Sequence, residues 1–192
     1  MQIRYPIDLT IEEYIEQKAW EQAELSHCPF HPDGGCGFAK HGTYSRKFPT
    51  HCLVVRYYCS DAHQSISLLP DFFASRLPGT LDEVEHVVNI VESSSSQEEA
   101  AFTLRPEIEL PSALRWLRRR LKYVNEVLTI LKGLLVTECS TELSSFRKVY
   151  KTENVLTRLR DIARDYLQSL PPVVGFGPRS NDRYYHLCVS NN

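Results

Sequence analysis

The spacing of hydrophobic residues predicts helices through most of the chain after residue 77. Thr80 and Glu83 have the spacing of a capping box, which favours a helix start at this point. Ser96 and Glu99 have the same spacing and predict a second, short helix that ends near Leu104, before Pro106. Hydrophobic positions three and four apart give the first of these helices one apolar stripe, made of Val84, Val87, Val88 and Val91.

A third, long helix is expected from Pro111, and a fourth from about Ser144 to Leu170. Two interpretations follow from their heptad-like spacing. The two helices could pair as an antiparallel hairpin within one chain, or the seam of the third could join two copies in a coiled-coil homodimer. The seam of the third helix consists of Leu114, Leu117, Leu121, Val124, Leu128, Leu131 and Leu135.

The N-terminal part of the chain has a different pattern. Thr10 and Glu13 predict a short helix over residues 10–26. Residues 27–70 are rich in proline and glycine, with three short β-rich stretches at Gly42–Phe48, Cys52–Cys59 and Ile66–Leu69. Such a segment is too small for an apolar core of its own, so a bound metal ion is the expected source of its stability.

Composition narrows the class of protein. Hydrophobic residues make up 42% of the 192 residues, which is enough to form a core, and the net charge of −2 means that any nucleic-acid contact must rest on a local basic patch. The longest apolar stretch, residues 124–136, is too short and too polar to cross a membrane, and residues 1–10 lack a signal-peptide pattern. We therefore expect a cytoplasmic protein without membrane contact, whose thiols are reduced and available to a metal.

Cysteine and histidine residues cluster between residues 28 and 63, and zinc is the metal that such ligands favour. Cys59 and His63 follow a predicted strand, as the second ligand pair of a zinc ribbon does. For the first pair, the partner of Cys28 is either His31 or Cys36. Cys28 and His31 have the two-residue spacing of a zinc knuckle, while Cys36 offers the softer thiolate ligand. The predicted set is Cys28, Cys36, Cys59 and His63, with His31 as the alternative to Cys36.

The start of the third helix is strongly basic. Residues 111–122 contain five basic residues and no acidic one. The preceding short helix and turn complete the order of a helix-turn-helix, in which a basic helix enters the major groove of DNA. The alternative is a solvated charged face on an ordinary bundle helix. The residues expected to contact DNA lie near one helix face: Arg115, Arg118, Arg119 and Lys122.

Several short motifs in this order carry a resemblance to a known family. Residues 28–69, with His41-Gly-Thr-Tyr44 and Ser67-Leu-Leu-Pro70, resemble the N-terminal zinc ribbon of bacterial insertion-sequence transposases and their short standalone relatives. The stretch 114–120, Leu-Arg-Trp-Leu-Arg-Arg-Arg, is similar to the recognition helix that follows the ribbon in that family. The resemblance covers about residues 28–120 and implies binding to double-stranded DNA at transposon-type sites. The carboxylates and α/β fold of a transposase catalytic domain have no counterpart after residue 70.

The sequence thus predicts a mainly α fold with a small N-terminal β zinc ribbon, a helix-turn-helix-like domain and a long helical hairpin. The expected parts are a helical segment (1–26), the ribbon (27–72), the helical domain (77–172) and an irregular tail (173–192). The expected function is zinc-stabilised DNA binding by a transposase-like protein without its own catalytic domain, and no motif of an enzyme is visible. The alternative is a regulatory module whose ribbon and heptad helices bind a protein partner.

Overall fold

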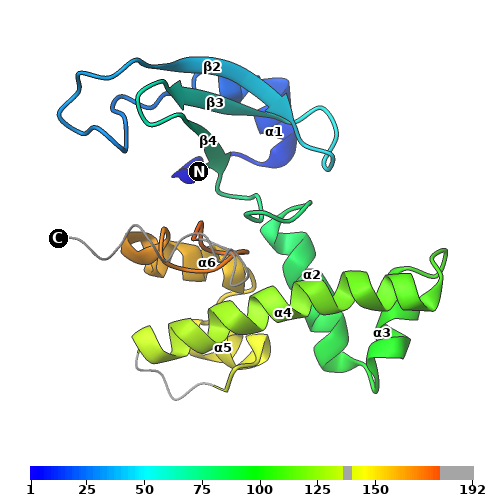
Figure 1. Ribbon diagram of the computed structural model, residues 1–192. Coiled ribbons are helices and arrows are strands. Elements are labelled where there is room, and N and C mark those ends of the chain that lie inside the picture. The colour runs from blue at the N-terminus through cyan, green and yellow to red at the C-terminus, as the bar shows by residue number, and fades with distance from the viewer. Residues whose placement is uncertain (136–139, 178–192) are drawn as a thin grey trace. The chain divides into compact units, whose positions relative to one another are not determined.

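The computed structural model describes residues 1–135 and 140–177, and it divides the chain into two compact units, Met1–Gly79 and Thr80–Asn192 (Figure 1). The first unit contains the β strands, and the second contains the longer helices. Cys139, Cys188 and most of the predicted irregular tail lie outside the described residues.

The first unit is built on a four-stranded mixed sheet with the strand order β1-β4-β3-β2. The strands are β1 (Gln2–Tyr5), β2 (Phe38–Ser45), β3 (Leu53–Cys59) and β4 (Gln64–Pro70). β2, β3 and β4 form an antiparallel meander, and β1 joins β4 in parallel.

The two faces of this sheet differ, because alternate residues of a strand point to opposite sides. Tyr57 of β3 and Ile66 of β4 are paired across the strands, and both are buried. The N-terminal segment covers this face, since the Tyr57 hydroxyl donates to the Ala23 carbonyl and accepts from the Leu25 amide. The opposite face carries polar residues, among them Arg56 of β3 and Ser67 of β4.

Helix α1 (Ile11–Glu16) and the 3₁₀ helix η1 (Ala19–Glu21) precede β2. The expected capping box is present: the Glu13 amide donates to the Thr10 hydroxyl oxygen at 3.2 Å, and the Thr10 amide donates to the Glu13 carboxylate at 2.8 Å. Tyr14 is fully buried, and its hydroxyl donates to the carbonyl of Leu53 at 2.9 Å, which ties α1 to the start of β3.

The predicted fold class, mainly α with a small N-terminal β zinc ribbon, is therefore wrong. Helix and strand make up 43% and 17% of the residues that the structure describes, and the strands form one mixed sheet rather than a separate ribbon. The prediction missed β1, because the strand has only four residues and its partner β4 lies more than sixty residues later. A fold with a sheet in one unit and helices in the other belongs to the α+β class.

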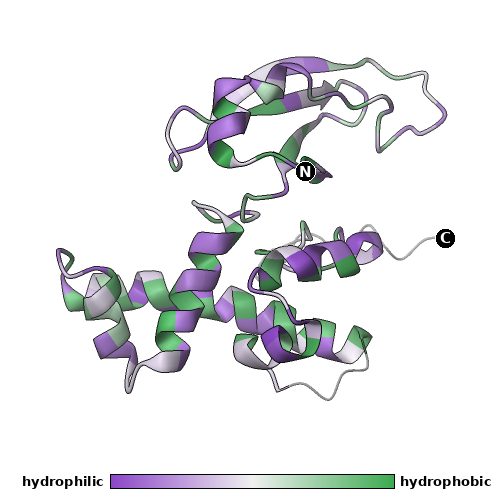
Figure 2. Ribbon diagram, turned by 180° about the vertical axis from the view of Figure 1, so that it is seen from behind, coloured by the Kyte–Doolittle hydropathy of each residue, from purple (hydrophilic) through white to green (hydrophobic). Residues whose placement is uncertain are grey.

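The second unit contains α2 (Leu81–Ser93), α3 (Gln97–Leu104), α4 (Leu110–Leu134), α5 (Leu143–Tyr150), α6 (Val155–Ile162) and the 3₁₀ helix η2 (Arg164–Tyr166). Both expected N-caps are present, with the Glu83 amide donating to Thr80 and the Glu99 amide donating to Ser96. Helix α2 is central, since it contacts α3, α4, α5 and α6. Hydrophobic and hydrophilic residues alternate along these helices (Figure 2).

The predicted long helical hairpin is also wrong. The expected fourth helix, residues 144–170, is divided into α5, α6 and η2. The break follows Tyr150, where Lys151 adopts a left-handed backbone conformation with φ of 49°. The seam of α4 is occupied within the chain: its members buried among the described residues are Leu117, Val124, Leu128 and Leu131.

Candidate metal centre

Three segments of the first unit bring cysteine and histidine side chains to one place. Cys28 and His31 lie on one tight turn, in which the His31 amide donates to the Cys28 carbonyl at 3.2 Å. Cys36 lies two residues before the start of β2, and Cys59 ends β3. The strand register explains their approach, because Phe38 pairs with Cys59 and thereby places the residues just before β2 beside the end of β3.

Four side chains meet here: the ligand atoms of Cys28, His31, Cys36 and Cys59 all lie within 4.8 Å of one another. His31 Nδ1 is 3.6 Å from the sulfur of Cys28 and 3.4 Å from the sulfur of Cys59. Around a tetrahedral zinc ion, sulfur and nitrogen ligands stand about 3.5 Å apart, given bond lengths of about 2.3 and 2.05 Å. The cluster therefore has dimensions that fit a four-coordinate metal site, and three thiols with one imidazole are a ligand set that soft or borderline ions favour.

The two turns that carry Cys36 and Cys59 pack directly against each other. A Cβ atom added to Gly37 would lie 2.2 Å from the Ser60 hydroxyl oxygen, so only glycine fits at this position without movement of Ser60. The Ser60 hydroxyl donates to the Asp61 carboxylate at 2.7 Å, and the Gly37 amide donates to the same carboxylate at 3.4 Å. The glycine after Cys36 thus permits the close approach that the cluster requires.

The thiols of the cluster differ in acidity. Burial raises the pKa of the Cys28 thiol, but hydrogen bonds from His31 and from the backbone outweigh it and lower the pKa to about 7. Burial raises the pKa of Cys36 to about 11, and the neighbouring sulfurs of Cys28 and Cys59 add to the increase. Three thiols this close repel one another as thiolates, and a bound cation removes that repulsion.

Four of the five candidate ligands thus come together, and His63 is not one of them. His31 and Cys36 were alternatives for one position in the sequence, whereas the structure brings both into the cluster. His63 lies exposed on the turn between β3 and β4 with φ of 50°, and its ring nitrogen is 3.4 Å from the Tyr58 hydroxyl. In the sequence, the feature that indicated His31 as a ligand was its two-residue spacing from Cys28, which is typical of a zinc knuckle.

The basic residues proposed for DNA lie on the first half of α4. Arg115, Arg118, Arg119 and Lys122 are all exposed. Arg118 donates from Nε to the Gln97 side chain at 2.9 Å and lies 4.0 Å from the carboxylate of Glu98 on α3. Lys122 lies 3.8 Å from Glu126. Neither Arg115 nor Arg119 forms an ion pair with a residue that the structure describes.

Trp116 and two other arginines form a stack beside this basic face. The guanidinium groups of Arg120 and Arg105 lie 4.0 Å and 4.6 Å from the centre of the Trp116 ring. Arg120 is nearly buried, and burial together with the charge of Arg105 lowers its pKa to about 10. Sequence reasoning missed this stack, whose cation–π contacts fix the turn between α3 and α4 to the start of the long helix.

Comparisons of the chain with protein-family models, with curated proteins and with solved structures return no match. Among the described residues, no helix has the length and hydrophobicity that a membrane span requires.

Proposed function

We propose that this chain is a zinc-stabilised DNA-binding protein, with zinc held by Cys28, His31, Cys36 and Cys59 and with DNA contacted by the exposed basic face of α4. The zinc assignment rests on the close match between the sulfur–nitrogen distances of 3.4 and 3.6 Å and those of a tetrahedral zinc site. Four protein ligands fill the coordination shell, so the proposed role of zinc is structural.

The choice of ligands has a direct test with a matched control. His31→Ala should lower the zinc content measured by native mass spectrometry, while His63→Ala, which removes an exposed histidine from the neighbouring turn, should leave one zinc ion per chain. His31→Cys should restore binding, because a fourth thiolate suits zinc. Loss of zinc in the His63 variant alone would refute the proposed ligand set.

The DNA assignment rests on the charge of the first part of α4, which is positive throughout: residues 110–125 contain basic residues and no acidic one. Arg115 and Arg119 stand one helical turn apart on the same exposed side, and helical spacing places Arg118 and Lys122 beside them. Planar guanidinium groups donate two parallel hydrogen bonds to phosphates or guanine edges. The order of helix, turn and basic helix, together with the resemblance of the motifs to transposon DNA-binding proteins, supports the same assignment.

Fluorescence anisotropy with labelled duplex DNA at increasing salt tests this proposal. If all four basic residues contact phosphates, the logarithm of the binding constant should fall with the logarithm of salt concentration with a slope of about −3.6. The double variant Arg115→Gln/Arg119→Gln should reduce the slope to about −1.8, while Arg158→Gln, which removes an exposed arginine from α6, should not change it. Equal slopes in the wild type and the double variant would refute the proposed interface.

A protein-interaction module is the second candidate, and exposed hydrophobic residues near the turn between α3 and α4 favour it. Phe102 of α3 is 71% exposed, and Leu110 at the start of α4 is 44% exposed. Apolar side chains of this size on a surface are common at protein interfaces. Phe102→Ser should then abolish self-association or partner binding seen by native mass spectrometry, whereas DNA binding through α4 should persist in that variant.

A further inference from the structure

The polar face of the sheet carries a row of side chains that crosses three strands. Gln2 of β1 pairs with Ser67 of β4, and Ser67 pairs with Arg56 of β3. Residues paired in this way point to the same side of a sheet. The row therefore places an amide, a hydroxyl and a guanidinium group side by side, on the face opposite Tyr57 and Ile66.

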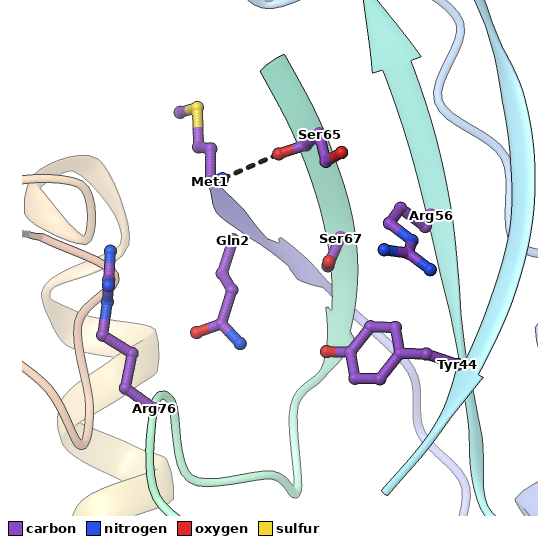
Figure 3. Close-up of a pocket in the computed structure, with 7 residues that line it drawn as sticks. All are labelled: Met1, Gln2, Tyr44, Arg56, Ser65, Ser67 and Arg76. Atoms are coloured by element: carbon purple, nitrogen blue, oxygen red, sulfur yellow. Dashed lines mark hydrogen bonds between the residues drawn. The ribbon is translucent and has the colours of Figure 1, made fainter.

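This row forms the floor of a hollow of about 340 Å³. Tyr44, Ser65 and Arg76 also line it, together with the N-terminal residue Met1. Figure 3 shows the Gln2 side chain between Arg76 on one side and Ser67, Arg56 and Tyr44 on the other. None of the described residues that line the hollow is acidic.

Arg56 is the residue most clearly adapted to a ligand. Its Nε atom is buried and has no hydrogen-bond partner among the described residues. The guanidinium group lies 5.7 Å from the centre of the Tyr44 ring, which supports it from one side. The side chain as a whole is half-buried and lines the hollow, so a ligand bound there can accept hydrogen bonds from its guanidinium group.

Arg76 brings the second positive charge from a loop. Its backbone has φ of 54°, a left-handed conformation that is uncommon for arginine. The loop is held by Arg46, which donates from Nη2 to the carbonyls of Leu77 at 2.6 Å and Ala74 at 3.3 Å. The position of Arg76 is thereby fixed from outside the hollow. Burial, and after it the charge of Arg76, lower the pKa of the Met1 amino group, which places this amino group close to Arg76.

We infer that this hollow binds the phosphate group of a small phosphorylated molecule. The guanidinium group of Arg56 can donate two parallel hydrogen bonds to a phosphate, and the hydroxyls of Tyr44, Ser65 and Ser67 are further donors. The volume exceeds that of a phosphate group and leaves space for the rest of a small ligand. A phosphodiester of a nucleic acid, with one charge per phosphate, is the other source of the same chemistry.

Calorimetric titration of the full zinc-loaded chain with inorganic phosphate, at constant ionic strength, tests the inference. The affinity tag belongs at the C-terminus, since the Met1 amino group donates to the Ser65 carbonyl at 2.7 Å beside the hollow. Arg56→Gln should weaken phosphate binding at least tenfold, and Ser67→Ala should weaken it several-fold. Arg158→Gln, on an exposed face of the helical unit, is the matched control and should bind like the wild type.

Two results would overturn the inference: no phosphate binding by the wild type, or equal affinity in the wild type and the Arg56→Gln variant. Circular dichroism and zinc content show whether Arg56→Gln is folded, and Arg56→Lys, which keeps the charge, should recover part of the affinity. Titration with a short single-stranded oligonucleotide separates the two phosphate sources. Loss of oligonucleotide binding in Arg56→Gln, when the wild type does not bind inorganic phosphate, is a case of the first result and would assign the hollow to nucleic acid instead. The Arg115→Gln/Arg119→Gln variant should retain phosphate binding, so failure of the DNA proposal is distinguishable.

Discussion

Removal of the Glu85 carboxylate should destabilise the helical unit far more than removal of the similar carboxylate of Glu92. Both residues lie on α2, and each accepts hydrogen bonds from the first amides of another helix. Glu85 accepts from Val155 at 3.1 Å and from Leu156 at 3.0 Å, at the start of α6. Glu92 accepts from the first two residues of α5 at 2.7 and 3.1 Å. The geometry is alike, whereas Glu85 is buried and Glu92 is exposed.

The difference in burial determines how much each alanine variant lowers the free energy of unfolding. In Glu92→Ala, water can replace the lost acceptor, so the cost is that of an ordinary helix cap, about 1 kcal/mol. In Glu85→Ala, two buried amides lose their acceptor, and Arg147 loses a bond of 3.0 Å to the same carboxylate. Breaking a buried ion pair costs about 3–5 kcal/mol. Arg147 keeps its bond to Asn89 at 2.9 Å, which places the estimate near the lower end, about 3 kcal/mol.

Urea unfolding followed by amide signals of the helical unit measures both losses. Because the chain has two units, a signal specific to the second is required for a two-state treatment. Hydrogen exchange at the amides of Val155 and Leu156 should accelerate in Glu85→Ala. Glu85→Gln should show an intermediate loss, because its single amide oxygen can accept from only one of the two amides and carries no charge. Equal losses in the Glu85 and Glu92 alanine variants, or a Glu85 loss below about 1 kcal/mol, would refute the reasoning.

Three further predictions concern residues whose environments are equally specific. Gly37→Ala should lower zinc affinity in a chelator competition assay, because the new Cβ would lie 2.2 Å from the Ser60 hydroxyl oxygen. The matched substitution Gly133→Ala, with no atom near the added Cβ, should instead stabilise α4 by about 0.5–1 kcal/mol. Arg160→Lys should cost about 2–3 kcal/mol in urea unfolding, because Arg160 is fully buried and donates to two backbone carbonyls at 3.0 and 2.8 Å that one ammonium group cannot match. Tyr14→Phe should cost about 1 kcal/mol, the value of its single hydrogen bond at 2.9 Å to a carbonyl at the start of β3, and a neutral thermal shift would contradict that.

Local signals in the sequence predicted the starts of the helices well. The capping residues Thr10, Thr80 and Ser96 all cap helices in the structure, because a cap is a contact between residues three positions apart. The break between α5 and α6 was not predicted. The first amides of α6 donate to Glu85, which lies on a helix some seventy residues earlier, and no pattern within residues 144–170 encodes that contact.

The metal cluster was predictable in part. The residue types and their clustering indicated a site, and three of the four predicted ligands, Cys28, Cys36 and Cys59, are in it. The choice between His31 and His63 depends on where the turns place each ring. His31 shares a turn with Cys28 and faces the sulfur of Cys59, whereas the left-handed turn at His63 directs its ring toward Tyr58. The spacing of residues in the sequence does not determine the direction in which each histidine ring points.

The hollow on the polar face could not be predicted from a sequence motif. Gln2, Ser67 and Arg56 come from three strands and become neighbours only because β1 joins β4 in parallel and β4 pairs with β3 in one register. A shift of one residue in the pairing of β3 would turn Arg56 to the face of Tyr57 and bury its charge against the apolar core. The same shift would turn Val55 and Tyr57, both buried, away from the core face, which disfavours that register. The packing of one face of the sheet therefore determines that Arg56 lines the hollow on the other.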